Sequence, residues 1–224
     1  MIFYLTKYKI YYKISIKESS DYMKSILISK IQEKKNEKKN KILKSAYKLF
    51  TKKGINATSI QDIVDDAGIA KGTFYLYFKD KYDLQKQLIV KKSQELFQNA
   101  IRAINKDVIN SFEDQIIFVI DYIIDIVSKD KTLINFIEKD LSLGIYSDVN
   151  EIINSYSIGI KDTFIRGLKE HNIKLKNPEV TLFMIIELTS STIFTSITKG
   201  KPLTIDKYKP YLYGAIRRII KEKF

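Results

Sequence analysis

The sequence contains no cysteine and no tryptophan, and one of its 224 residues is a histidine. The absence of cysteine excludes disulfides, thiolate metal sites and cysteine nucleophiles. With His171 as the single histidine, we expect neither a zinc site nor a histidine-based catalytic triad. The sequence also lacks a phosphate-cradling glycine loop and a paired nucleophile and base. It therefore predicts no enzyme, no metal site and no cofactor.

Glycine (8) and proline (3) are both scarce, so few positions would interrupt a helix. Ile, Leu, Lys and Glu recur at helical spacing, and no stretch alternates convincingly over several strands. The sequence therefore predicts an all-α fold. Its apolar stretches are poor membrane spans, because lysines break up the first 22 residues and Glu187 lies with several Ser and Thr residues in the apolar segment 178–199.

Positive charge dominates the chain and is concentrated near its beginning. The formal net charge is +13. Residues 1–36 contain eight lysines and three acidic residues, and residues 37–85 contain ten lysines and six acidic residues. Such an excess suits a polyanionic partner, either nucleic acid or an anionic membrane surface. A biased genome composition would also produce many lysines, so the charge supports this interpretation without establishing it.

Residues 58–84 are the most informative stretch, with two short helical patterns separated by Gly68. The first pattern opens with a capping box of the S/T-x-x-Q type at Thr58 to Gln61. Gly68 can end this helix, because a residue without a Cβ adopts the left-handed conformation at little cost. A second helix is expected at about residues 70–77. Two helices joined by a short glycine-containing turn form the outline of a helix-turn-helix.

The second of these helices has an apolar side and a polar side. Phe74 and Phe78 lie one turn apart and would anchor it against the first helix. Gly72 inside a short helix costs about 1 kcal/mol relative to alanine, and close approach of a phosphate backbone would explain its presence. Tyr, Thr and Lys are suitable donors to phosphates. The outward side consists of Lys71, Gly72, Thr73, Tyr75, Leu76 and Tyr77.

These residues resemble the DNA-binding domain of TetR-type transcriptional regulators. The resemblance implies that helix 70–77 enters the major groove of operator DNA and that Lys81 grips a phosphate. Ala70 replaces the usual capping serine, and Leu76 suggests a contact with a thymine methyl group. The matching positions are Thr58-Ser59-Ile60, Ile63-Val64, Ala67-Gly68-Ile69-Ala70, Gly72-Thr73-Phe74-Tyr75, Tyr77-Phe78, Lys81 and Leu84. The implied DNA contacts are Thr58, Ser59, Gln61, Lys71, Gly72, Thr73, Tyr75, Leu76, Tyr77 and Lys81.

The resemblance also divides the chain into an extension (1–36), the helix-turn-helix domain (37–85) and a larger helical ligand-binding and dimerisation domain (86–224). The first helix of the DNA-binding domain is expected at about 36–53, ending at Gly54. A long helix capped by Asp80 would continue to about residue 105 and link the two domains.

The extension allows several interpretations. The interpretations are an amphipathic element for a membrane surface, an extra helix or loose arm, and a segment added by a start codon placed too early, with Met23 as the true start. A lysine cluster close to the DNA-binding domain would follow a minor groove, as the resemblance implies, or would simply be solvated. These lysines are Lys34, Lys35, Lys38, Lys39 and Lys41.

In the C-terminal domain, segment 114–128 is apolar nearly all round except for a stripe of aspartates. Asp121 or Asp125 would be a counter-ion for a cationic ligand, or part of an ordinary solvated face. Phe136 and Tyr156 are further candidates for a ligand site, although such stripes more often form plain core. The last two helices, at about 178–199 and 205–222, would form the homodimer interface that the resemblance implies.

The sequence thus predicts a cytoplasmic, homodimeric transcriptional regulator that binds a palindromic DNA operator as a repressor and is released by an unidentified small-molecule effector. The alternative is a DNA-bound scaffold that needs no ligand and recruits a protein partner. No membrane partner is expected.

Overall fold

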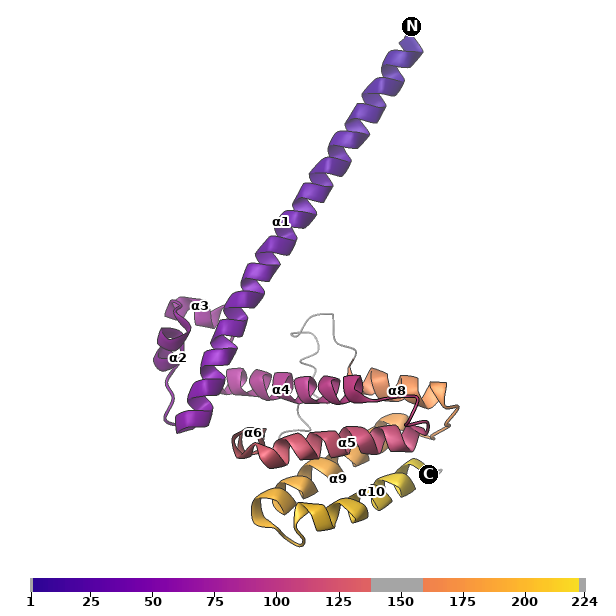
Figure 1. Ribbon diagram of the computed structural model, residues 1–224. Helices are drawn as coiled ribbons and strands as arrows, with labels where there is room; N and C mark the ends of the chain where they lie inside the picture. The colour runs from indigo at the N-terminus through magenta and orange to yellow at the C-terminus, as the bar shows by residue number, and fades with distance from the viewer. Residues whose placement is uncertain (1, 138–158, 222–224) are drawn as a thin grey trace.

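The computed structural model describes residues 2–137 and 159–221, which form helices joined by turns without any β-strand (Figure 1). The all-α prediction is confirmed. The helices are α1 (Ile2–Lys53), α2 (Ile60–Ala67), α3 (Lys71–Tyr75), α4 (Lys81–Ala103), α5 (Phe112–Lys129), α6 (Lys131–Ile137), α8 (Ile160–Glu170), α9 (Pro178–Lys199) and α10 (Ile205–Lys221).

Helix α1 begins far earlier than the sequence predicted. The expected start was near residue 36, but α1 is continuous from Ile2 and projects well beyond α2 and α3 (Figure 1). The reason is the absence of any glycine or proline before Gly54, where a backbone φ of +81° ends the helix. Residues 27–38 are exposed along its whole circumference. The extension is therefore described as a helix rather than a loose arm.

The end of α1 packs with α2, α3 and the start of α4 around a small apolar core. Phe74 and Phe78 are fully buried in this core, which confirms their predicted role as anchors. Their rings lie 5.6 Å apart, and Gly68 takes the predicted left-handed conformation between α2 and α3. The buried members are Ile42, Leu43, Ala46, Phe50, Ile63, Val64, Phe74, Phe78, Leu84 and Leu88.

The capping box of α2 lies one residue later than predicted. Ser59 is the N-cap, and its hydroxyl accepts a hydrogen bond from the backbone N–H of Asp62 at 3.0 Å. The Asp62 carboxylate in turn accepts from the Ser59 N–H at 2.8 Å. Thr58 instead donates its hydroxyl to the Gly54 carbonyl at 2.7 Å. An aspartate at the third helical position completes the box as effectively as the glutamine that the sequence pattern suggested.

Helices α4, α5, α6, α8, α9 and α10 form the C-terminal domain around a second and larger core. Helix α9 has the predicted bounds, with Asn177 as its N-cap and a left-handed Gly200 at its end. It is long and apolar enough to cross a membrane by length and composition, yet eight of its residues are buried against neighbouring helices. Its apolar composition therefore has an explanation in the protein core.

Helix α8 approaches α5 closely at Gly167. A Cβ at this position would lie 2.2 Å from the ring of Phe112, because the ring packs directly on the helix backbone. The same ring lies 5.6 Å from the rings of both Phe164 and His171. The missing side chain of Gly167 thus makes room for an aromatic cluster that joins α5 to α8.

We expect Gly167→Ala to lower the free energy of unfolding by about 1–3 kcal/mol, because the Phe112 ring would have to leave its position. Gly72→Ala is the matched control, since a Cβ on Gly72 would meet no atom within 4 Å. Urea unfolding of both variants measures the difference. Equal stability of the two variants would show that the ring at Phe112 adjusts without cost.

Candidate nucleic-acid interface and ligand cavity

Helix α3 presents to solvent the side chains that the sequence predicted as its outward surface. Lys71, Gly72, Tyr75 and Leu76 are exposed, and the side chain of Leu76 is 76% accessible. Thr73 and Tyr77 on the flanks are half-buried. The exposed side chains of Lys71, Tyr75 and Leu76, on α3 and its C-cap, form a surface suited to contact with another molecule.

Gly72 has no internal role that the structure reveals. Its backbone φ is not in the left-handed range, and the space where its Cβ would lie is empty. Packing and backbone geometry therefore do not require glycine here, although alanine would favour the helix by about 1 kcal/mol. Close approach of an external backbone remains the explanation that the sequence suggested.

The polar residues before and within α2 are already engaged inside the domain. The Thr58 side chain is buried, and the Ser59 hydroxyl caps α2. Gln61 is exposed and donates from its Nε2 to the Asp65 carboxylate at 2.8 Å. The Ser59 backbone N–H, Lys53 and the Ser59 hydroxyl together lower the pKa of Asp62 to about 2. Of the three predicted contacts before α3, Ser59 and Gln61 are exposed and Thr58 is buried.

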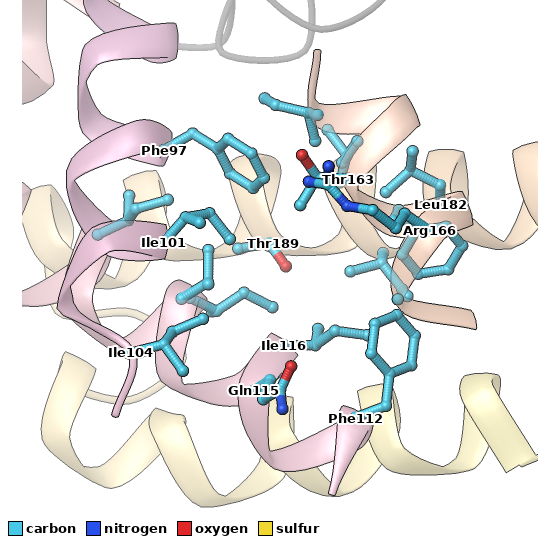
Figure 2. Close-up of a pocket in the computed structure, with 18 of the residues that line it drawn as sticks. Phe97, Ile101, Ile104, Phe112, Gln115, Ile116, Thr163, Arg166, Leu182 and Thr189 are labelled. Atoms are coloured by element: carbon cyan, nitrogen blue, oxygen red, sulfur yellow. The ribbon is translucent and has the colours of Figure 1, made fainter. Parts of the chain in front are cut away.

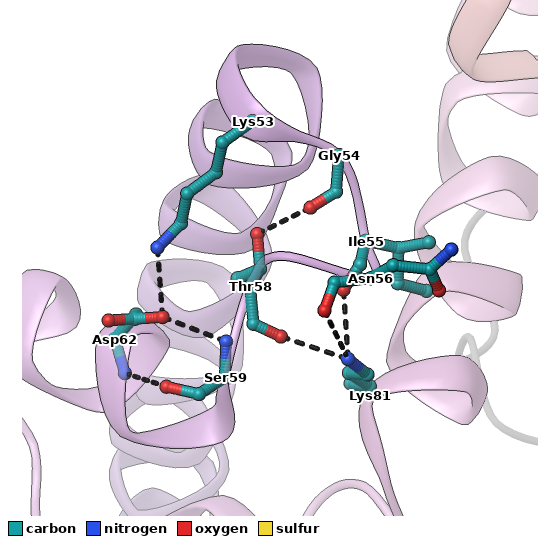
Figure 3. Close-up of polar contacts among 8 residues, drawn as sticks. All are labelled: Lys53, Gly54, Ile55, Asn56, Thr58, Ser59, Asp62 and Lys81. Atoms are coloured by element: carbon teal, nitrogen blue, oxygen red, sulfur yellow. Dashed lines mark hydrogen bonds and ion pairs between the residues drawn. The ribbon is translucent and has the colours of Figure 1, made fainter.

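Lys81 at the start of α4 donates to three backbone carbonyls of the turn between α1 and α2 (Figure 3). Its Nζ lies 2.9 Å from the Ile55 oxygen, 3.3 Å from that of Asn56 and 3.1 Å from that of Thr58. An ammonium has three N–H donors, so all of them have partners here. The geometry gives Lys81 a positioning role that the sequence did not suggest. A phosphate contact stays a prediction.

The start of α3 has the geometry that its sequence suggested. Ala70 occupies the N-cap position and offers no side-chain hydrogen bond to the helix. Asp80, by contrast, caps α4 as predicted, accepting from the backbone N–H groups of Tyr82 and Asp83 at 2.8 Å each. Helix α3 is therefore short and has no side-chain cap, whereas α4 has the Asp80 side chain as its N-cap.

A cavity of about 340 Å³ lies in the C-terminal domain between α4, α5, α8 and α9 (Figure 2). This volume is within the range of small-molecule sites. Most of its lining residues are apolar. The lining residues are Ser93, Phe97, Ile101, Ile104, Lys106, Phe112, Gln115, Ile116, Val119, Ile120, Ile123, Ile160, Thr163, Phe164, Arg166, Gly167, Glu170, Leu182, Ile185, Ile186 and Thr189.

The charged lining residues lie at the rim and pair with one another. Glu170 is 3.6 Å from the ammonium of Lys106 and 4.0 Å from the guanidinium of Arg166. About half of the side-chain surface of Arg166 and Glu170 is accessible, and more of Lys106. The other described lining residues are uncharged, and they are apolar except for Ser93, Gln115, Thr163 and Thr189.

Asp121, Asp125 and Phe136 are not among the residues that line this cavity. Asp121 and Asp125 face α10, where Lys209 pairs with both at 2.6 Å and Tyr213 donates its hydroxyl to Asp121. Burial opposes the charge on Asp121, but the hydrogen bonds from Lys209 and Tyr213 outweigh it and lower the pKa of Asp121. Burial and the neighbouring Asp121 raise the pKa of Tyr213. The aspartate stripe is therefore part of the packing between α5 and α10.

The structure describes one of the other two candidates. Phe136 on α6 lies at the junction of the two domains, with its ring 5.2 Å from and edge-on to the ring of Tyr47 on α1. Lys92 on α4 lies 5.0 Å above the same Tyr47 ring. Tyr156 lies outside the described residues. The sequence offered no signal for the true lining, because cavity-facing isoleucines follow the same helical spacing as core isoleucines.

Among the described residues, no group of three or more His, Asp or Glu side chains could hold a metal ion. The structure shows an exposed helix with lysine, tyrosine and glycine on one domain and a largely apolar cavity in the other. The two are joined by α4.

Comparison with known proteins agrees with this geometry. Residues 42–88 match the family described as bacterial regulatory proteins, tetR family. The uncharacterised HTH-type transcriptional regulator YerO of Bacillus subtilis is 56% identical over 46 residues, which are 20% of this chain and 16% of that protein. The uncharacterised regulator YhgD of the same species is 26% identical over 171 residues, covering 75% of this chain and 88% of that protein.

Solved structures share the fold at lower identity. FadR from Bacillus subtilis, determined in complex with stearoyl-CoA, has a TM-score of 0.50 at 19% identity, over 81% of this chain and 97% of that chain. RolR in complex with resorcinol has a TM-score of 0.60 at 14% identity, over 85% of this chain and 90% of that chain. The likeness therefore extends from the helix-turn-helix through the C-terminal domain.

We expect Gly72→Ala to weaken binding to specific DNA by roughly tenfold or more without lowering stability, since the added methyl group points only outward. Fluorescence anisotropy with labelled DNA gives the affinity, and thermal unfolding gives the stability. An unchanged affinity would show that no DNA backbone approaches this position.

We expect Lys81→Met to lower the free energy of unfolding by about 1–3 kcal/mol, because three carbonyls lose a charged donor. Lys71→Met is the control, as Lys71 is exposed and has no polar partner among the described residues. The control should lose DNA affinity while keeping its melting temperature. If Lys81→Met also keeps its melting temperature, the contacts in Figure 3 do not stabilise the domain.

Proposed function

Because the chain is a DNA-binding transcriptional regulator of the tetR family, we propose that it is a homodimeric repressor that binds a palindromic operator and is released from it by a small molecule. The observation that carries this proposal is the continuity of α4. Its first residue, Lys81, contacts the turn that precedes α2, and its residues Ser93, Phe97 and Ile101 line the cavity. One helix thus connects the two sites.

Helix α3 would enter the major groove, with Lys71, Thr73 and Tyr75 as the main contacts. Lysine hydrogen-bonds to guanine acceptors or phosphates, while tyrosine and threonine hydroxyls donate to phosphates. The exposed Leu76 would contact a thymine methyl group. Thr58, Ser59, Gln61, Gly72, Tyr77 and Lys81 complete the proposed DNA contacts. Their backbone or side-chain atoms lie in the segments before, within and just after α3.

Two copies would pair through α9 and α10. Val180 and Tyr211, one on each helix, are large hydrophobic side chains that are exposed in the single chain. A two-fold axis relating two such surfaces would place two copies of α3 on one face of the DNA. The operator would then be a palindrome with half-sites about one helical turn, roughly 34–36 Å, apart or somewhat farther.

Release would follow from a change in α4. A molecule that fills the cavity and fits one tilt of α4 better than another shifts the population toward that tilt. A molecule that fits both equally well shifts nothing, however tightly it binds. The structures of FadR with stearoyl-CoA and of RolR with resorcinol are precedents for small molecules on this fold. The cavity favours this mechanism over a ligand-independent scaffold.

We propose the cytoplasm as the place of action, since the operator DNA would lie there. Helix α9, the one described helix with sufficient length and hydropathy for a membrane span, is used instead in the core and in the proposed dimer.

The test is gel-shift binding of the purified protein to the intergenic DNA that flanks its own gene, with unrelated DNA as competitor. We expect a palindrome-dependent complex in the nanomolar range or tighter, with an affinity that falls steeply as salt rises. Sedimentation analysis should give a dimer both free and on DNA. Equally weak binding to every sequence, or a monomer on the operator, would contradict the proposal.

A further inference from the structure

Two buried hydroxyl groups in the cavity have no hydrogen-bond partner among the described residues: Oγ of Ser93 and Oγ1 of Thr189. Ser93 on α4 is 5% exposed and Thr189 on α9 is 8% exposed. Both residues line the same cavity. Figure 2 shows the Thr189 hydroxyl directed into the open space between the helices.

Two other buried hydroxyls of α9 donate hydrogen bonds to backbone carbonyls. Thr181 donates to the Asn177 carbonyl at 3.1 Å, and Ser196 donates to the Leu203 carbonyl at 2.7 Å. Helical threonines and serines commonly bond to the backbone in this manner. Thr189 therefore differs from these two hydroxyls of its own helix, and Ser93 on α4 likewise has no partner among the described residues. A buried polar group without a partner is destabilising, and such a group in a cavity suggests that a bound molecule supplies the partner.

The chemistry of the wall limits what that molecule can be. Lys106, Arg166 and Glu170 lie at the rim and neutralise one another in part. The other described lining residues are apolar except for the hydroxyls of Ser93, Thr163 and Thr189 and the amide of Gln115. None of them is charged, so an ionised group among them would be desolvated without compensation by an opposite charge. The inner end of the ligand must therefore be neutral. An oxygen atom on it can accept a hydrogen bond from a serine or threonine hydroxyl, and a hydroxyl on it can also donate one.

We propose that this cavity binds a compact, largely apolar molecule whose inner end carries a neutral hydroxyl or carbonyl group that hydrogen-bonds to Ser93 and Thr189. This assignment rests on the proposed function, because it names the chemical class of the effector. The volume of about 340 Å³ corresponds to roughly eleven water molecules in the liquid, which is room for a molecule of one or two rings.

The probes are three naphthalenes of nearly equal shape: 1-naphthol with a neutral hydroxyl, 1-methylnaphthalene with a methyl group in its place, and 1-naphthoate with a charge. Binding to the full chain is measured by titration calorimetry, or by displacement of a fluorescent apolar dye. We expect 1-naphthol to bind about tenfold more tightly than 1-methylnaphthalene, because only the hydroxyl pairs with Ser93 and Thr189. The naphthoate should bind least tightly.

The double variant Ser93→Ala with Thr189→Val keeps the shape of the cavity and removes both hydroxyls. It should fold with an unchanged or higher melting temperature, since neither hydroxyl has a partner to lose. It should bind 1-naphthol and 1-methylnaphthalene equally. Thr181→Val is the matched control: it removes a buried but satisfied hydroxyl on α9 outside the cavity. The control should keep the preference for the naphthol and lose some stability.

Three results would overturn the assignment: equal binding of 1-naphthol and 1-methylnaphthalene to the unaltered protein, a preference that survives in the double variant, or no binding of any probe. Operator release is scored separately by gel shift. If 1-naphthol binds through Ser93 and Thr189 but never weakens the DNA complex, the ligand class stands and the effector role of the cavity fails. If the DNA complex is released by a molecule that ignores both hydroxyls, the effector role stands and the ligand class fails.

Discussion

Helix α4 contributes buried side chains to both apolar cores, and the rest of the structure depends on this shared helix. Leu84 and Leu88 are buried in the core of the N-terminal domain, and Leu96 is buried in that of the C-terminal domain. A helix of 23 residues is about 35 Å long, and its backbone hydrogen bonds keep it rigid. Lys81 binds the start of this helix to the turn before α2, and the contact of Tyr47 with Phe136 joins α1 to α6. The packing of one helix therefore joins the helix-turn-helix to the cavity.

Features set by neighbouring residues could be predicted from the sequence. Phe74 and Phe78, Gly68, the Asp80 cap and the bounds of α9 depend on helical periodicity and on local capping chemistry, and the structure agrees with each. The capping box was displaced by one residue, because Thr58 and Ser59 are both competent caps and the choice depends on the turn that Lys81 holds. The predicted start of α1 near residue 36 was wrong, because no glycine or proline interrupts the helix in the lysine-rich segment before it.

Features set by the meeting of distant segments could not be predicted. The aspartates of α5 had the spacing of a solvated stripe, and only α10 supplies Lys209, Tyr213 and Arg217 opposite them. The cavity has the same origin: an isoleucine facing it differs from one in the core only by what lies across from it. Gly167 is a further case. It must lack a side chain because the ring of Phe112, more than fifty positions earlier in the chain, lies where its Cβ would be.

The projecting part of α1 makes this chain two thermodynamic units rather than one. Residues 27–38 are exposed all round, so this stretch gains nothing from tertiary burial and depends on intrinsic helix propensity alone. Beyond Ile42, α1 belongs to a cooperative core. On heating, the first unit loses helix gradually and the second in a single step, and a circular dichroism melt records their sum. A sloping baseline before the main transition is thus a property of the native architecture of this protein.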